Sequence, residues 1–277
     1  MIPIVLPKNV FILPAVLLLC LILQLFPAYG SDDTEDIGSA SERTYAAYQR
    51  AYPRIKKQLA QKNLDLGSPV FIRIFKQSKE LEVWMRDNDN TFVLYKTFAI
   101  CHHSGTLGPK QEEGDRQSPE GFYRVGSSQM NPLSQYHLAF NLGYPNSYDL
   151  AYGRTGDALM VHGRCSSIGC FAMTDYYMDE IYTLTDRALA SGQQEFQVHI
   201  FPFRLTPENL AAQRSSTWLS FWKNLKEGFD YFEKNRRPPI VDVRGKRYVI
   251  YAPPRHQIAY MVDQAATGKT PFSPTPR

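Results

Sequence analysis

The chain has 277 residues, of which 43% are hydrophobic and 21% are charged. These values exclude a fully disordered or low-complexity protein, and the length is sufficient for one sizeable core with additions. The formal net charge of +4 is small and spread along the chain, so it gives no footprint for nucleic-acid binding. Four cysteines are too few for a disulfide-based scaffold, and a single apolar run excludes a protein with many membrane spans.

Residues 1–30 show the order of features of a secretory signal. Lys8 is the only charged residue among them, an apolar run follows at 10–26, and Ala28 and Gly30 supply the small residues that signal peptidase reads. We therefore predict a signal peptide. An uncleaved anchor in the inner membrane is the alternative, although the run is short for a membrane span. Both interpretations place the folded part outside the inner membrane.

Residues 31–66 are predicted to form an acidic leader followed by a helix. Residues 31–42 are polar, acidic and small, which is typical of a flexible segment. From Arg43 onward, apolar residues recur near helical spacing, and Pro53 predicts a kink or a restart of the helix. The predicted apolar face consists of Tyr45, Tyr48, Tyr52, Ile55 and Leu59.

Residues 67–205 change to a period of two and are predicted to be one mainly β domain of the α+β kind. A Gly-, Pro- and charge-rich stretch at 101–121 is predicted to be a surface loop. A helix is predicted from a cap at Thr174 or Asp175 to a stop at Gly192. The predicted strands cover 70–75, 80–86, 91–100, 121–126, 137–142, 158–161 and 196–203.

Residues 206–277 are predicted to be a C-terminal extension. It begins with a helix from Thr206 to about Asn235, continues as a hairpin over 241–251 and ends in a disordered tail. Aromatic residues form a stripe along the helix, and packing against the β domain is the default interpretation. Covering of an active site or binding of a partner is the sharper hypothesis. The stripe contains Trp218, Phe221, Trp222, Leu225, Phe229 and Phe232.

The stretch from Met160 to Asp175 contains the residue types of cysteine acyl-transfer chemistry. His162 ends an apolar strand, and Cys170 stands immediately before a helical pattern. A thiol attacks an acyl group as the thiolate, so an imidazole that takes its proton and a helix N-terminus that lowers its pKa favour this chemistry. Gly169 permits close approach of a substrate to the backbone. The pattern predicts a Cys–His enzyme with its nucleophile on a strand-to-helix turn.

Other interpretations of the same residues stay open. A buried free cysteine is common, and His162, Cys165 and Cys170 are three residues of types that bind zinc. Cys165 and Cys170 are also candidates for a disulfide in an oxidising compartment. A disulfide between Cys101 and Cys165 is a further hypothesis.

The same stretch resembles the signature of the L,D-transpeptidase catalytic domain family, of the YkuD type. The matching elements are His162-Gly163 and Ser167-Ile168-Gly169-Cys170. Further motifs resemble the YafK-like branch found in Gram-negative periplasmic proteins, and the similarity covers roughly residues 67–205. These motifs are Ser104-Gly105, Leu107-Gly108-Pro109-Lys110, Gly114-Asp115, Ser118-Pro119-Glu120-Gly121-Phe122-Tyr123 and Tyr144-Pro145-Asn146.

The resemblance implies a β-sandwich catalytic domain with helical N- and C-terminal extensions, and it implies a role for each matching residue. Cys170 matches the nucleophile, and His162 matches the general base that later returns the proton. The backbone N–H groups of Gly169 and Cys170 match the oxyanion hole. Ser167 matches a residue that orients the histidine through its backbone carbonyl, and Gly163 is a candidate for substrate binding.

The chain departs from the family pattern beside the nucleophile. The family continues Gly-Cys with Ile or Val and then an arginine linked to binding of a stem-peptide carboxylate, whereas this chain has Phe171-Ala172. Arg164 and Arg154 are the predicted substitutes. Ile168 replaces the common histidine between Ser and Gly. These departures leave the nucleophilic chemistry intact and concern the specificity for donor and acceptor.

The resemblance implies a periplasmic enzyme that acts on peptidoglycan stem peptides and needs no cofactor. In the leading hypothesis, the enzyme forms a thioester with diaminopimelate and passes it to an amine, either on a second stem in a 3–3 cross-link or on a wall-linked envelope protein. A murein hydrolase that trims stems or releases wall-linked protein is the alternative. A non-catalytic wall-binding module on the same fold is the third hypothesis.

Several polar residues outside this stretch receive structural predictions. His102 and His103 are assigned to a surface loop in preference to a metal cluster, because adjacent strand residues point to opposite faces. His199 alternates with Val198 and Ile200, so it is predicted to point away from them as a structural residue. Four basic residues are predicted to lie on solvated strand faces, with contact to an anionic glycan-peptide as the alternative. They are Arg73, Lys76, Lys96 and Arg124.

Overall fold

The computed structural model describes residues 40–253. The chain divides into two units, of which the first, Met1–Ile37, lies outside the described residues, as do the predicted signal peptide, most of the acidic leader and the C-terminal tail. All described residues belong to the second unit, Gly38–Arg277. Within residues 40–253, no helix has the length and apolar character needed to cross a membrane.

Five strands form a first sheet in the order β3-β2-β1-β10-β5, and its long antiparallel segment is the predicted meander. β1 and β10 pair in parallel, and the neighbouring pairs are antiparallel. The predicted strands in 70–100, at 121–126 and from 196 onward are therefore confirmed. The strands are β1 (Val70–Phe75), β2 (Glu80–Arg86), β3 (Phe92–Ala99), β5 (Gly121–Gly126) and β10 (Glu195–Phe201).

Five shorter strands form a second sheet in the order β4-β9-β8-β7-β6. β8 and β9 are parallel, and the other pairs are antiparallel. The prediction of a loop throughout 101–121 is wrong at its start, because β4 pairs with β9 there. The strands are β4 (His102–His103), β6 (Met130–Asn131), β7 (Ala139–Asn141), β8 (Met160–His162) and β9 (Phe171–Ala172).

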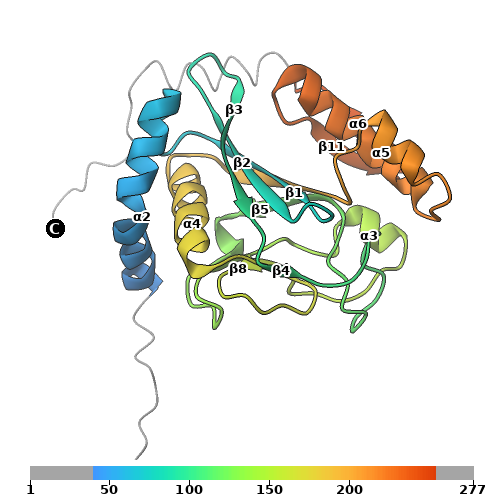
Figure 1. The fold of residues 1–277 in the computed structure, drawn as a ribbon, viewed down its shortest axis with the longest axis horizontal. Coiled ribbons are helices and arrows are strands. Elements are labelled where there is room, and N and C mark those ends of the chain that lie inside the picture. Colours follow the sequence, from blue (N-terminus) through green and yellow to red (C-terminus); the bar gives the residue numbers. More distant parts are fainter. Residues whose placement is uncertain (1–39, 254–277) are drawn as a thin grey trace, which may run out of the picture. The chain divides into compact units, whose positions relative to one another are not determined.

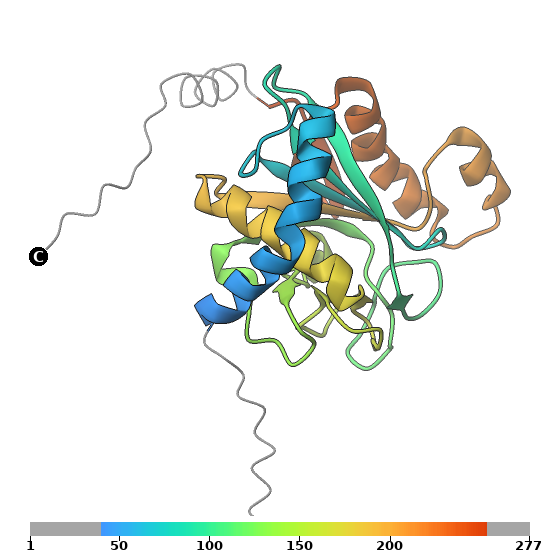
Figure 2. The ribbon, with the colours of Figure 1, turned by 60° about the vertical axis from the view of Figure 1, so that its left-hand side comes forward.

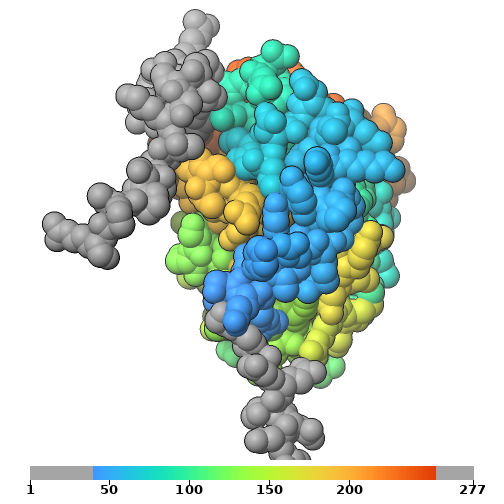
Figure 3. Space-filling view, turned by 90° about the vertical axis from the view of Figure 1, so that its left-hand side faces the viewer, coloured from blue at the N-terminus to red at the C-terminus, as the bar shows by residue number. Residues whose placement is uncertain are grey.

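Two helices cross on one side of the sheets, α2 (Ala40–Lys62) and α4 (Asp175–Ala190) (Figure 1). Figure 2 shows the crossing, and in Figure 3 side chains of α4 emerge on either side of α2. The predicted apolar face of α2 is confirmed at Ile55 and Leu59 and wrong at Tyr45, which is exposed; the buried residues recur at every fourth position. Pro53 lies inside α2 on its exposed side and does not end it. The buried residues are Ala47, Ala51, Ile55 and Leu59.

The C-terminal segment covers the other face of the first sheet. The predicted single helix is wrong: α5 (Pro207–Ala212) ends before α6 (Leu219–Asn235) begins. Ser216 lies in the break, and its Oγ accepts from the Trp218 N–H at 3.2 Å, a local bond that competes with helical hydrogen bonding. The predicted hairpin is confirmed as β11 (Ile240–Arg244) and β12 (Arg247–Tyr251). The remaining elements are the 3₁₀ turn η1 (Ser127–Gln129) and α3 (Ser147–Ala151).

This cover explains why every residue of β1 is buried. Val70, Ile72 and Ile74 join a core shared with the second sheet, α2 and α4. The alternate residues Phe71 and Phe75 join aromatic clusters that include side chains of α6. Because strand residues alternate between faces, a sheet covered on both sides shows no polar face in its sequence.

Candidate active site

The second sheet brings His162 and Cys170 onto neighbouring strands. β8 ends at His162, and β9 begins one residue after Cys170. The two strands pair in parallel with His162 opposite Ala172, and the Met160 N–H donates to Cys170 Sγ at 3.3 Å. Strand pairing therefore holds Cys170 beside Met160, two residues before His162 and on the same face of the sheet as His162.

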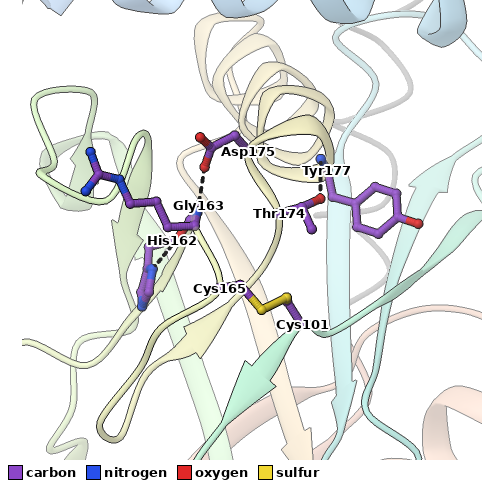
Figure 4. The surroundings of a disulfide bond; sticks show 8 residues. Cys101, His162, Gly163, Cys165, Thr174, Asp175 and Tyr177 are labelled. Carbon is purple, nitrogen blue, oxygen red and sulfur yellow. Dashed lines mark hydrogen bonds between the residues drawn. A yellow bond between two sulfur atoms is a disulfide. The ribbon is translucent and has the colours of Figure 1, made fainter.

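The His162 imidazole is 3% exposed and has a defined orientation. Its Nδ1 lies 2.6 Å from the Gly163 carbonyl oxygen, an acceptor, so Nδ1 carries the proton and Nε2 keeps a free lone pair (Figure 4). Burial lowers the pKa of His162, opposed in part by this hydrogen bond. The Tyr136 ring packs against the imidazole with centroids 4.9 Å apart. The ring is thus held in one orientation by the backbone of Gly163 and by an aromatic neighbour.

Cys170 is a free thiol of intermediate exposure. Burial raises its pKa, and the Met160 N–H, the Ser167 hydroxyl and the charge of Lys110 oppose that rise. The thiol is therefore protonated at rest, and its activation requires a base. The predicted start of the helix at Thr174 or Asp175 is confirmed. The predicted strand-to-helix turn at Cys170 is wrong, because β9 lies between the thiol and α4.

The start of α4 instead fixes the loop after His162. Thr174 caps the helix by accepting from the Tyr177 N–H at 3.3 Å, and Asp175 Oδ1 accepts from the Arg164 N–H at 2.5 Å (Figure 4). A Cβ at Gly163 would lie 2.6 Å from Asp175 Oδ1 and 2.9 Å from the Tyr136 carbonyl oxygen. Gly163, predicted to bind substrate, is therefore needed for close backbone packing, and its carbonyl orients His162.

Ser167 contacts the backbone of Cys170. Its hydroxyl donates to the Cys170 carbonyl at 2.9 Å. The prediction that the Ser167 carbonyl orients His162 is wrong, since the imidazole donates to Gly163. Gly169 has a φ of +105°, which favours glycine, and its N–H donates to Ser104 Oγ at 2.6 Å. The Gly169 N–H, predicted to belong to the oxyanion hole, is thus already engaged in a hydrogen bond.

The two arginines predicted to substitute for the family arginine have different surroundings. Arg154 is 5% exposed, pairs with Asp149 at 2.7 Å and lies over the Tyr148 ring, so its charge is used inside the fold. It is not available to a substrate carboxylate, and that prediction is wrong. Arg164 is exposed. It remains the candidate of the two.

Cys101 and Cys165 form a disulfide with their Cα atoms 5.4 Å apart (Figure 4). This confirms the hypothesis of a pairing between them. Because the Cys165 sulfur is bonded to Cys101, it is neither a partner of Cys170 nor a thiolate ligand for zinc. The bridge ties the loop between His162 and Cys170 to the segment that leads into β4.

A buried network supports the loop opposite Cys170. Lys76 and Glu120 form an ion pair at 3.0 Å with both side chains 0% exposed. Glu120 also accepts from the Gly108 N–H at 2.7 Å and from Trp222 Nε1 at 2.8 Å, and Lys76 donates to the Ser118 carbonyl at 2.9 Å. The predicted solvated position of Lys76 is wrong, because its ammonium group is buried against Glu120 and the carbonyls of Gly108 and Ser118.

The other basic and histidine residues lie away from this chemistry. Arg73 was predicted to be solvated and is instead 2% exposed, paired with Glu82 at 2.8 Å. His199 is fully buried against Phe71 and Phe122, which confirms its structural position.

Lys96 pairs with Glu180 at 3.0 Å, and Arg124 pairs with Glu195 at 2.5 Å, both at partly exposed positions. The surface-loop assignment of His102 and His103 is wrong: they form β4, with His103 Nε2 bonded to the Lys76 carbonyl at 2.9 Å. Within residues 40–253, no group of three or more His, Cys, Asp or Glu side chains is arranged to hold a metal ion.

Three residues near the pair had no role in the sequence-based prediction. Ser104 and Ser118 lie in motifs of the family resemblance, and Ser118 Oγ donates to the Cys170 carbonyl at 3.3 Å. Tyr136, which packs on His162, lies outside those motifs. The motifs that contain Ser104 and Ser118 could have indicated that these serines lie near Cys170. The contact of Tyr136 with His162 could not be predicted, because it depends on the path of a loop.

A hollow of about 450 Å³ lies elsewhere, between α2, α4 and the segment around β6. Thr44, Tyr182 and Asp186 are among its lining residues. No predicted catalytic residue lines it. We therefore locate the candidate active site by the Cys170–His162 pair and not by the size of a hollow.

The family model of the L,D-transpeptidase catalytic domain, YkuD, matches residues 69–200. The protein named "Putative L,D-transpeptidase YafK" of Escherichia coli K12 is 46% identical over 193 residues, which cover 70% of this chain and 78% of that protein. The protein of the same name from E. coli O157:H7 gives the same values. The chain belongs to the L,D-transpeptidase family, so the predicted family and fold class are confirmed.

Solved structures are more distant. The crystal structure of the helical cell shape determining protein Pgp2 from Campylobacter jejuni is 21% identical, with a TM-score of 0.40 and coverage of 76% of each chain. The structure of Bd1075 from Bdellovibrio bacteriovorus is 18% identical, with a TM-score of 0.35 and coverage of 64% of this chain and 78% of that one.

Proposed function

We propose that this chain is a periplasmic peptidoglycan L,D-transpeptidase in which Cys170 is the nucleophile and His162 is the general base. The observation that carries the proposal is the His162 hydrogen bond to the Gly163 carbonyl, which leaves the Nε2 lone pair free on the strand beside Cys170. A neutral imidazole whose pKa is lowered by burial is suited to take the proton of a protonated thiol.

The reaction proceeds through a thioester. Cys170 Sγ attacks the carbonyl of diaminopimelate in a tetrapeptide stem while its proton passes to His162 Nε2. The tetrahedral intermediate then expels the terminal D-Ala, whose amine takes that proton. An amine acceptor resolves the thioester, either on a second stem in a 3–3 cross-link or on a wall-linked envelope protein.

The test is incubation of the purified protein with tetrapeptide muropeptides. Cys170→Ala should abolish product formation, and His162→Ala should lower its rate by roughly 10²- to 10⁴-fold, the usual contribution of a positioned base. The wild-type rate should fall in acid below pH 6.5, because protonation of His162 removes the base. Full activity of Cys170→Ala would overturn the proposal.

A murein hydrolase is the second candidate, favoured by one observation. Ala172 stands where the family has the carboxylate-binding arginine, and Arg154 is held by Asp149. Water instead of an amine would then resolve the same thioester, trimming stems or releasing wall-linked protein. Product analysis with and without an added amine acceptor separates the two reactions. An intact mass that never shows acylation of Cys170 would instead favour a wall-binding module.

A further inference from the structure

The family resemblance assigns the Gly169 N–H to the oxyanion hole. In the structure it donates to Ser104 Oγ at 2.6 Å. An N–H that already serves one acceptor offers less to an oxygen that becomes negative in the transition state. A complete hole at Cys170 therefore requires a donor besides the backbone N–H of Cys170 itself.

Strand register places Ser104 beside the nucleophile. β4 pairs with β9 so that His102 lies opposite Ala172 and His103 opposite Phe171. Continued by one residue, the same antiparallel register puts Ser104 opposite Cys170. Directly opposed residues share a face of the sheet, so the hydroxyl and the thiol lie on the same face. His162 lies opposite Ala172, two positions from Cys170, and shares that face as well.

The hydrogen bonds of Ser104 leave its proton available. A hydroxyl has one proton and two acceptor lone pairs, and Ser104 Oγ accepts from Gly169 while donating to none of residues 40–253. Accepting an N–H bond strengthens the hydroxyl as a donor. The Ser104 backbone is fixed on both sides: its N–H donates to Ser118 Oγ at 3.2 Å, and its carbonyl accepts from the Ser118 N–H at 3.0 Å.

We infer that the Ser104 hydroxyl is a catalytic residue that donates to the oxyanion, together with the Cys170 N–H. When Cys170 Sγ bonds to the substrate carbonyl carbon, the π electrons move to oxygen, and the thiol proton goes to His162 Nε2. Ser104 donates a hydrogen bond to that oxygen and keeps its own proton. When the double bond re-forms, the leaving amine takes the proton from His162. The inference rests on the proposed function, because Cys170 must be the nucleophile.

The main test measures the rate of Cys170 acylation by a tetrapeptide muropeptide, followed by intact-protein mass. Ser104→Ala should lower this rate by roughly 10²- to 10³-fold, as removal of an oxyanion donor does in other enzymes. If Ser104 only occupied the Gly169 N–H, its removal would free that donor, and acylation would be unchanged or faster. That outcome overturns the inference.

A second pair of variants covers the case in which Ser104→Ala does not fold. Ser104→Thr and Ser104→Val have nearly the same shape and differ in the hydroxyl. The threonine variant should acylate within a few-fold of wild type, whereas the valine variant should show the full loss. Equal rates for the two variants would contradict a role for the hydroxyl.

Alkylation of Cys170 by iodoacetamide separates an oxyanion donor from a residue that merely positions the thiol. This displacement forms no tetrahedral oxyanion, so Ser104→Ala should alkylate at the wild-type rate. Ser167→Ala is the matched control, because its hydroxyl also donates to the Cys170 carbonyl but does not hold Ser104, and it should change both rates by the same factor. A selective loss of acylation in Ser167→Ala would assign the effect to a displaced loop and overturn the inference.

The wild-type protein distinguishes the two levels of failure. Absence of any acyl group on wild-type Cys170 would contradict both the proposed function and this inference. Normal acylation of wild type and of both hydroxyl-free variants would remove the role of Ser104 alone.

Discussion

The histidine half and the cysteine half of the site are supported by opposite ends of the described chain. On the histidine side, Arg43 of α2 donates to the carbonyls of Ser134 and His137, and the loop between them carries Tyr136, which packs on His162. A second contact of α2 is the ion pair between Arg50 and Asp179, in which the Arg50 side chain is 49% exposed. The N-terminal helix thus acts through polar contacts that are partly open to solvent.

On the cysteine side, the contacts are buried. Trp222 of α6 donates to Glu120, which accepts from the Gly108 N–H and pairs with Lys76. Lys76 donates to the Ser118 carbonyl, and Ser118 contacts Cys170. Bonds of similar length differ in consequence, because solvent screens exposed pairs, whereas a buried charge that loses its partner has no substitute. We expect the cysteine half to be the more sensitive one.

The largest effect is expected for Glu120→Gln. The change leaves the Lys76 charge without its counter-ion in a fully buried site, which should lower the free energy of unfolding by about 3–5 kcal/mol. Urea unfolding measures the loss. Acylation of Cys170 by the protein that remains folded should also slow, because the loop that holds Ser118 loses its support.

Glu82→Gln is the matched control for that experiment. Glu82 is also buried, pairs with Arg73 and Arg204 and accepts from Trp84, but none of these contacts reaches the loop at Ser118. It should lose stability while the acylation rate per folded molecule stays at the wild-type value. Equal slowing in both variants would mean that lost stability, and not the network at Cys170, controls acylation.

Trp222→Phe should give the next largest effect. The variant keeps an aromatic ring and removes one hydrogen bond to a buried carboxylate, at a cost of about 1.5–3 kcal/mol. Trp84→Phe removes the equivalent 2.8 Å bond to Glu82 and serves as its control. Thermal unfolding should show similar losses, with slower acylation only for Trp222→Phe. A wild-type rate of acylation in Trp222→Phe would show that α6 does not influence the active site through this bond.

The sequence predicted that His162 and Cys170 lie near each other because the signal is local. The spacing of His162 and Cys170 and the neighbouring glycine lie within ten residues, and the meander showed its strands through period-two alternation. The supports of the pair could not be predicted in the same way. Arg73 appeared solvated because no pattern within β1 reveals that α6, over a hundred residues later, covers the second face of the strand. Lys76 appeared solvated because its partners come from the loop at 108–120.

The errors at the active site itself have the same origin. The helix cap at Thr174 or Asp175 was recognised, but β9, which lies between Cys170 and that cap, has two residues and is too short to be recognised from periodicity. The choice between the carbonyls of Ser167 and Gly163 as the partner of His162 depends on loop geometry. Hydrogen-bond partners that come from loops are set by tertiary packing, which a residue pattern does not encode.

On the histidine side, Arg50→Ala should have a smaller effect that depends on pH. Burial would raise the pKa of Asp179, but hydrogen bonds from Arg50 and His137 outweigh it and hold that pKa below its usual value. The pairing therefore stabilises the fold above the unfolded pKa of about 4, and this contribution is lost as pH falls through the folded pKa. We expect a loss of roughly 1–2 kcal/mol at pH 7.

Urea unfolding between pH 3 and pH 7 checks this expectation, since the difference between Arg50→Ala and wild type should shrink below pH 4. Acylation per folded molecule at pH 7 should stay within about twofold of wild type, because Arg43 still holds the loop of Tyr136. A tenfold loss of acylation would show that the histidine half is as closely coupled to its extension as the cysteine half.

The smallest effect is expected on the exposed side of α6. Lys226 and Asp230 form a pair one helical turn apart, with side-chain exposures of 25% and 54%. Lys226→Ala should lower the free energy of unfolding by no more than about 0.5 kcal/mol, and the difference should vanish in 1 M salt because solvent ions screen such a pair. Acylation of Cys170 should not change, since the contact of α6 with the network beside Cys170 is the hydrogen bond from Trp222, on the buried face of the helix, to Glu120. Slower acylation in Lys226→Ala would show that the whole helix, and not this one buried contact, positions the loop beside the thiol.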